Sequence, residues 1–130
     1  MAKVVYYNRN PDGERENDCV TRAISLASKI PYPIIRKKLF HISKLLNCEK
    51  LCVCCYRHLL DDYFKYPRVE CYGETIEQFA NKHPEGTYLV RMQGHITTII
   101  NGDIWDIFDC GNEICTDAWK VSWLVNKFML

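Results

Sequence analysis

The hydrophobic pattern of the chain changes near residue 87, and this change limits the folds it can adopt. Before that point apolar residues recur at three- and four-residue spacing, as they do in amphipathic helices. After it, short runs rich in apolar and β-branched residues alternate with turn signals, which is typical of strands. Helices followed by a strand meander predict an α+β fold in which N-terminal helices precede an antiparallel sheet.

Local signals place the ends of the expected elements. Asn10-Pro11-Asp12-Gly13 predicts a turn, Pro33 suits the first turn of a helix, and Asn47 suits a helix end. Thr75 and Gln78 match a capping box. The expected helices are 20–28, 33–46, 56–66 and 76–82, and the expected strands are 3–7, 88–92, 95–100, 104–108 and 119–121.

Composition narrows the classes of protein that fit. A chain of 130 residues with 48% hydrophobic content is enough for one core, so residues 1–130 are expected to form a single domain. The net charge of +1 does not favour a nucleic-acid or membrane partner. The run Arg36-Lys37-Lys38 is better explained as a solvated helix face than as a phosphate site.

The distribution of apolar residues also bears on location. The apolar stretch at the N-terminus is too short for a secretory signal, and no window reaches the length of a membrane span. We therefore expect a cytoplasmic protein without a membrane partner. Because disulfides persist mainly in oxidising compartments, the eight cysteines are expected to be reduced.

One cysteine stands where a reactive thiol would be expected. Cys19 follows Asn17 and Asp18, either of which is a good helix N-cap, and it precedes an apolar helical stripe. A helix N-terminus stabilises an anion through its unpaired N–H groups and its dipole. Cys19 is therefore the candidate nucleophile.

A histidine and two acids on the predicted hairpin supply candidate partners. His95 begins one strand, and Asp106 and Asp109 lie on or just after the next. A three-residue loop, Asn101-Gly102-Asp103, would pair His95 with Asp109, which is the favoured orienting acid. A two-residue loop would instead pair His95 with Phe108 and leave Asp106 diagonal to the histidine, so Asp106 is the fallback.

These residues resemble the papain-like cysteine peptidases, in which a cysteine begins the central helix and histidine with Asn or Asp follows on the sheet. More narrowly, three segments are similar to small phage-encoded proteins: Asn17-Asp18-Cys19-Val20-x-Arg22-Ala23-Ile24-Ser25, Gly86-Thr87-Tyr88-Leu89-Val90 and Gly94-His95-Ile96-Thr97. The resemblance spans residues from about 14 to 120. It implies a papain-like fold acting in the cytoplasm of a phage host.

One position departs from the papain-like pattern. These peptidases usually carry a glutamine six residues before the cysteine, which completes the oxyanion hole, and here that residue is Gly13. Oxyanion stabilisation is therefore expected from the backbone N–H of Cys19, joined by Asn17.

A second group of residues suggests metal binding. Cys48, Cys52, Cys54, Cys55 and His58 are close in sequence and carry zinc-ligand side chains. Their spacing fits a two-knuckle zinc site loosely, and free cysteines are often packing residues. We therefore expect no bound metal and no cofactor.

The leading hypothesis is a thiol hydrolase that cleaves a peptide or isopeptide bond of a host or phage protein. Cys19 would attack the carbonyl, His95 would act as general base, and Asp109 would orient the imidazole. The alternative is a non-catalytic papain-like phage protein that binds and inhibits a host defence protein. A third hypothesis is a zinc-stapled interaction module. The expected partner is a protein or peptide rather than nucleic acid.

Overall fold

The structure, a computed structural model, describes residues 2–13, 18–49 and 52–122. In this part of the chain helices and strands form an α+β arrangement, as the sequence predicts. The strands are β1 (Val4–Tyr6), β2 (Thr87–Met92), β3 (His95–Ile100), β4 (Asp103–Asp106) and β5 (Cys115–Lys120). The helices are α1 (Cys19–Ser28), α2 (Tyr32–Leu46), α3 (Val53–Arg57) and α4 (Ile76–Lys82), with a π-helical segment, His58–Tyr63, directly after α3.

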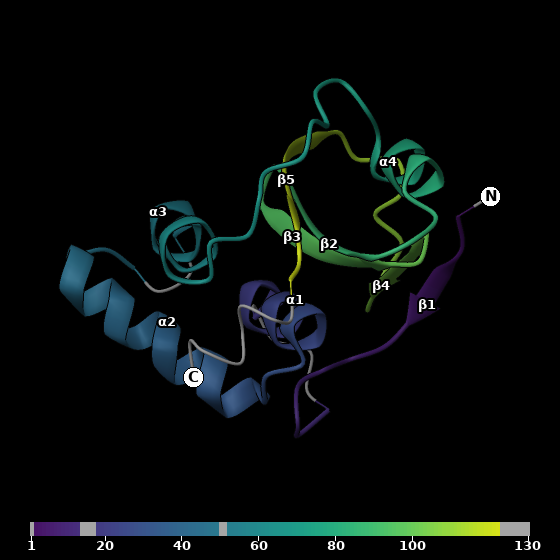
Figure 1. Cartoon of the computed structure of the whole chain (residues 1–130). Coiled ribbons are helices and arrows are strands. Elements are labelled where there is room, and N and C mark those ends of the chain that lie inside the picture. Colours follow the sequence, from purple (N-terminus) through teal and green to yellow (C-terminus); the bar gives the residue numbers. More distant parts are fainter. Residues whose placement is uncertain (1, 14–17, 50–51, 123–130) are drawn as a thin grey trace.

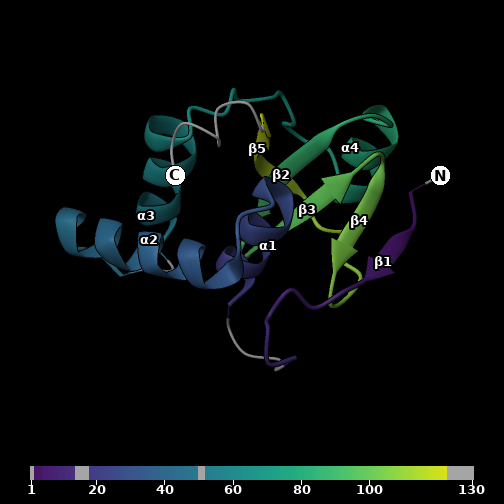
Figure 2. The ribbon, with the colours of Figure 1, turned by 60° about the horizontal axis from the view of Figure 1, so that its bottom comes forward.

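The five strands form one sheet in the order β1-β4-β3-β2-β5. Strands β2, β3 and β4 pair antiparallel in chain order, as the meander predicts, but β5 pairs antiparallel with β2 and not with β4. The N-terminal strand β1 instead joins the edge parallel to β4, with Tyr6 opposite Asp106 (Figure 2). The first strand of the chain therefore supports the strand that carries a candidate acid.

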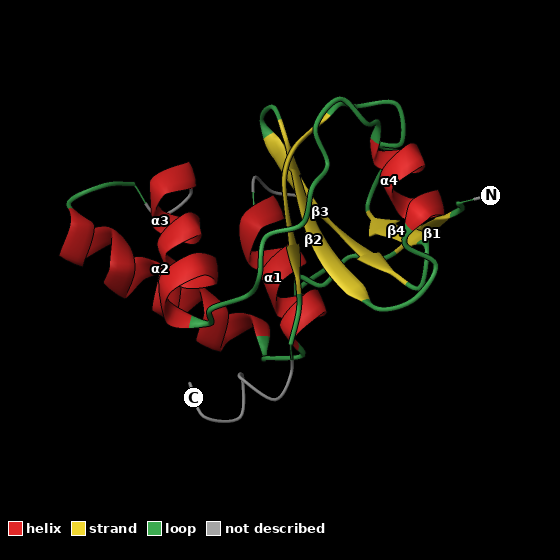
Figure 3. Cartoon of the chain, turned by 45° about the horizontal axis from the view of Figure 1, so that its top comes forward, coloured by secondary structure: helices red, strands yellow, loops and turns green. Residues whose placement is uncertain are grey.

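Helices cover both faces of the sheet (Figure 3). On one face α1, α2 and α3 form a core with Leu89, Ile96 and Trp119 of the sheet. On the other face α4 packs over Val90 and Ile99 in a second core. Neighbouring strand residues such as Leu89 and Val90 enter different cores because side chains alternate along a strand.

Helix α1 lies against the middle of the sheet, between it and α2 (Figure 1). The hydroxyl of Thr98 on β3 donates a hydrogen bond of 2.9 Å to the carbonyl of Ala23 on α1. Both groups are buried, so this bond fixes the height of the helix above β3. The start of α1 is thereby placed near the start of β3.

Several local predictions are confirmed. The turn at residues 10–13 forms, with the N–H of Gly13 donating to the carbonyl of Asn10 at 3.0 Å. Asn47 ends α2 in the left-handed conformation, and Thr75 and Gln78 form the capping box of α4. The third helix differs from its prediction, because it starts at Val53 and changes to π-helical geometry at His58. Among the described residues, none of the helices has the length and apolar character needed to span a bilayer.

Candidate active site

Cys19 is the first residue of α1, as the sequence predicts. Asp18 occupies the N-cap position, but its carboxylate is held by side chains instead of capping the helix. It accepts hydrogen bonds from Tyr32 at 2.7 Å and Asn10 at 3.0 Å, and it forms a 2.8 Å ion pair with Arg22. This buried set fixes the backbone that presents Cys19.

His95, at the start of β3, faces a carboxylate from β4. Its Nε2 lies 2.6 Å from Oδ2 of Asp106, and the two side chains are 12% and 5% exposed. The other carboxylate oxygen, Oδ1, accepts the backbone N–H of Ile107 at 2.7 Å. The imidazole also forms a side-chain hydrogen bond with Cys19. The three side chains therefore form a line from thiol to imidazole to carboxylate.

The structure corrects the choice of Asp109 as the orienting acid. The hairpin turn has two residues, because Ile100 pairs with Asp103 and both Asn101 and Gly102 have positive φ. Strand β4 ends at Asp106, and Oδ1 of Asp109 accepts the N–H of Gly111 at 2.8 Å in the following turn. Asp106, the fallback, takes the position at His95.

The same register explains the position of Phe108. The two-residue loop predicts Phe108 opposite His95, and their ring centroids lie 4.7 Å apart at an interplanar angle of 43°. Because the Phe108 ring is 45% exposed, it covers the imidazole from the solvent side. The histidine is thus held by a carboxylate at one ring nitrogen and by an aromatic face.

The surroundings of Cys19 favour its thiolate. Burial raises the pKa of the Cys19 thiol. This effect is outweighed by the hydrogen bond and positive charge of His95, together with the backbone N–H of Ile96 and the charge of Arg22. The pKa therefore lies below its ordinary value. A thiolate is the reactive form of cysteine. Cys19 therefore has the electrostatic environment of a nucleophile.

The histidine responds in the opposite direction. Burial lowers the pKa of His95, but the hydrogen bonds and charges of Asp106 and Cys19 outweigh it and raise the pKa to about 9. Burial raises the pKa of Asp106, while His95, Thr97 and the N–H of Ile107 lower it below its ordinary value. The lowered pKa of Cys19, the raised pKa of His95 and the lowered pKa of Asp106 therefore all favour a thiolate–imidazolium pair beside a carboxylate.

Comparisons with protein-family models, with curated proteins and with solved structures found no match. The interpretation of the site therefore depends on its own geometry.

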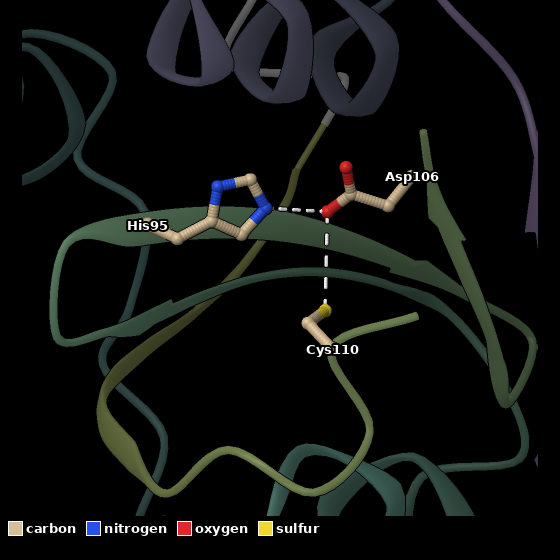
Figure 4. Close-up of side chains that lie close together, drawn as sticks. All are labelled: His95, Asp106 and Cys110. Atoms are coloured by element: carbon tan, nitrogen blue, oxygen red, sulfur yellow. Dashed lines mark hydrogen bonds and ion pairs between the residues drawn. The ribbon is translucent and has the colours of Figure 1, made fainter. Parts of the chain in front are cut away.

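A second cysteine, Cys110, also lies close to the candidate acid. Sγ of Cys110 lies 3.9 Å from Oδ2 of Asp106, the oxygen that also meets His95 (Figure 4). Among the described residues, His95, Asp106 and Cys110 are the one group whose side-chain atoms lie close enough together to hold a metal ion. Burial and the charge of Asp106 raise the pKa of Cys110 to about 12, so its thiol is protonated. In this arrangement Oδ2 of Asp106 is engaged by the imidazole of His95.

The cysteines at residues 48–55 lie away from this acid: Cys48 and Cys52 fall between α2 and α3, and Cys54 and Cys55 are in the first turn of α3. Sγ of Cys52 and Sγ of Cys54 are 2.8 Å apart, and Cys48 interacts with Cys54 and Cys55. His58 turns to Asp62 instead, at 3.0 Å. The proposed ligand set is therefore divided, and its histidine is paired with an acid.

Some site residues were missed in the sequence or lie outside the described part. Asn17, the expected second oxyanion donor, falls outside the described residues. Thr97 could have been found because it lies two residues after His95 and shares its strand face. The role of Arg22 could have been found from its position one helical turn after Asp18. Cys110 carries no such signal, because it reaches Asp106 through a turn.

Proposed function

We propose that this chain is a papain-like thiol hydrolase that cleaves a peptide or isopeptide bond. The observation that carries the proposal is the line of Cys19, His95 and Asp106, with the thiol at a helix N-terminus and the histidine between thiol and carboxylate. Such a line supplies a nucleophile, a proton carrier and an orienting acid.

In the acylation step the thiolate of Cys19 attacks the substrate carbonyl and forms a C–S bond. The C–N bond then breaks, and the imidazolium of His95 gives its proton to the leaving amine. Asp106 keeps Nε2 of the ring engaged, which leaves Nδ1 as the nitrogen that can exchange a proton with the thiol and the amine. The products of this step are a thioester on Cys19 and a free amine.

Water completes the cycle. The neutral imidazole takes a proton from water as its oxygen attacks the thioester carbonyl, the C–S bond breaks, and the thiolate and imidazolium form again. Asp106 stabilises the imidazolium in both steps by its charge. The cycle needs no cofactor.

The N-terminus of α1 supplies an oxyanion donor. The fourth residue of the helix, Arg22, donates its N–H to the carbonyl of Asp18 at 3.0 Å, which leaves the N–H groups of the first residues without an intrahelical acceptor. The Cys19 N–H is one of them and lies on the nucleophile itself. It can donate to the oxygen of the tetrahedral intermediate, a contribution that typically lowers such barriers by about 3 kcal/mol.

The placement of α1 against β3 also supports a papain-like fold, in which helix and sheet bring the thiol and the histidine together. With the resemblance to phage-encoded proteins, we propose that the chain acts in the host cytoplasm on a host or phage protein. The substrate is a protein or a peptide.

The test compares Cys19→Ala with Cys54→Ala, which removes an exposed thiol at residues 48–55. Cys19→Ala should abolish the effect of the chain on a bacterial host, and Cys54→Ala should keep it. Both should melt within a few degrees of the wild type, because neither thiol contributes much to packing. A fully active Cys19→Ala protein would exclude hydrolysis and favour the non-catalytic inhibitor.

A further inference from the structure

A cavity of about 170 Å³ opens directly beside the reactive pair. Cys19 and His95 form part of its wall, Arg91 and Met92 of β2 form another part, and Tyr56 of α3 lies opposite. A substrate group bound in this cavity would be adjacent to the scissile bond. Its lining therefore bears on which substrates Cys19 can attack.

Away from Cys19 and His95, the lining combines apolar side chains with the phenol of Tyr56 and one fixed cation. Val20, Val53 and Met92 contribute apolar side chains, and Arg91 contributes a guanidinium that is 19% exposed. Nε of Arg91 donates to Oδ2 of Asp117 at 2.5 Å, which fixes the orientation of the group. Among the described residues, the guanidinium of Arg91 makes no other hydrogen bond to protein, so its two Nη groups are available to a ligand.

The charge around Arg91 is positive in sum. Asp117 is shared by Arg57, Arg68 and Arg91, and Arg68 also pairs with Asp61. Three guanidinium groups thus face two carboxylates. Burial raises the pKa of Asp117, but hydrogen bonds from Arg57 and Arg91 bring it below its ordinary value. The negative charge of Asp117 is therefore already included in this comparison of guanidinium groups with carboxylates.

The remaining polar wall adds no negative charge. Burial raises the pKa of Tyr56 to about 12, so its phenol stays neutral. The lowered pKa of Cys19 and the raised pKa of His95 favour an ion pair whose two charges cancel. An anion that enters the cavity therefore meets a surplus cation whose two Nη groups can donate side by side to a carboxylate.

From this geometry we propose that the cavity binds a substrate carboxylate carried on a short apolar stem next to the scissile bond. This inference depends on the proposed hydrolase function. The carboxylate comes either from an aspartate or glutamate side chain or from a free C-terminus. Arg91 is then the specificity-determining residue, and the apolar wall holds the stem.

The experiment has one arm for each source of the carboxylate. The first measures labelling of Cys19 by peptidyl acyloxymethyl ketones with glutamate or glutamine next to the ketone. The second measures cleavage of peptides in which the residue after the scissile bond ends in a free acid or in an amide. In one of the two arms, we expect the compound that carries the carboxylate to react about tenfold faster than its neutral counterpart.

Two variants connect that preference to Arg91. Arg91→Gln should abolish it, and Arg91→Lys, which keeps a charge without the planar donor group, should retain a smaller preference. Arg68→Gln is the matched control, since it also removes a cation from Asp117 but lies outside the cavity. It should keep the preference, and thermal melting checks that each variant folds.

The outcomes separate this inference from the proposed function. Equal rates for acid and neutral compounds in both arms, or a preference that survives in Arg91→Gln, would overturn the inference while labelling of Cys19 continues. If no compound reacts at Cys19 in the wild type, the hydrolase proposal and the inference fail together.

Discussion

Asp106 and Asp109 are chemically identical residues three positions apart, and backbone register alone assigns their roles. Asp106 is diagonal to His95 on the hairpin and contacts its imidazole, while Asp109 accepts a backbone N–H within a turn. A sequence pattern that gives an acid near the correct distance does not decide between them. The dipeptide Asn101-Gly102 could have decided it, because Asn-Gly is the strongest signal for a two-residue hairpin turn.

Replacing each acid in turn tests this assignment. Asp106→Ala should slow labelling or hydrolysis at Cys19 by about 100-fold, because the imidazole loses its orientation and its charge partner. Asp109→Ala should stay within about twofold of wild type and lose about 1 kcal/mol of stability with the bond to Gly111. Labelling rates and melting curves measure both. Similar losses in the two variants would contradict the register argument.

Reactivity distinguishes Cys19 from a second low-pKa thiol. The hydrogen bond from Cys54 lowers the pKa of Cys52, which makes Cys52 the main competitor for alkylation. At pH 6 Cys19 should react fastest with iodoacetamide. His95→Ala should slow Cys19 about tenfold or more and leave Cys52 unchanged. Mass mapping of the alkylated peptides decides the order, and an unchanged rate at Cys19 would refute its activation by His95.

At the scale of elements, periodicity and end signals predicted α1, α2, α4 and the central strands well. The sequence missed the parallel pairing of β1 with β4, since these partners lie far apart in the chain and no local pattern records a long-range pairing. It also missed the early start of α3 and its π-helical continuation, because no residue there carries a cap signal. The cavity beside Cys19 combines residues from four elements, α1, α3, β2 and β3, so it became visible only in the fold.

The hairpin turn is the element on which the acid depends most. Gly102 has φ +81°, and a Cβ there would meet the Cα of Pro84 at 3.3 Å. Gly102→Ala should therefore cost roughly 2 kcal/mol or more. Gly73 has φ +79° with open space around it, so Gly73→Ala should cost about 1 kcal/mol. Denaturant titration compares the two, and equal losses would mean that the contact with Pro84 is unimportant.

At the scale of the molecule, the raised pKa of His95 predicts how stability depends on pH. A group whose folded pKa lies above its ordinary 6.5 stabilises the fold fully below about pH 6.5, and this contribution is lost as pH rises towards about 9. A Cys19→Ala background removes the opposing titration of the thiol. In it, the pKa of His95 keeps the part of its rise that comes from Asp106, so the thermal midpoint should still fall as pH rises above about 6.5, and adding Asp106→Ala should flatten the curve. Parallel curves would contradict the prediction.

The whole protein is also expected to be free of stoichiometric zinc. His58 is paired with Asp62, and the cysteines at residues 48–55 lack knuckle spacing. Elemental analysis of the purified chain should give far less than one zinc per molecule, and a chelator should leave the melting curve unchanged. One zinc per chain, with unfolding on chelation, would favour the zinc-stapled module.

The pairing of β1 with β4 determines when the thiol can become reactive during protein synthesis. The nucleophile is made early, but its histidine and acid are made near the end of the chain, and Asp106 sits on a strand that rests against the first one. A ribosome-bound fragment that ends before β3 therefore carries Cys19 with an ordinary thiol. The proposed site is thus completed only after β3 and β4 have been made and β4 can pair with β1.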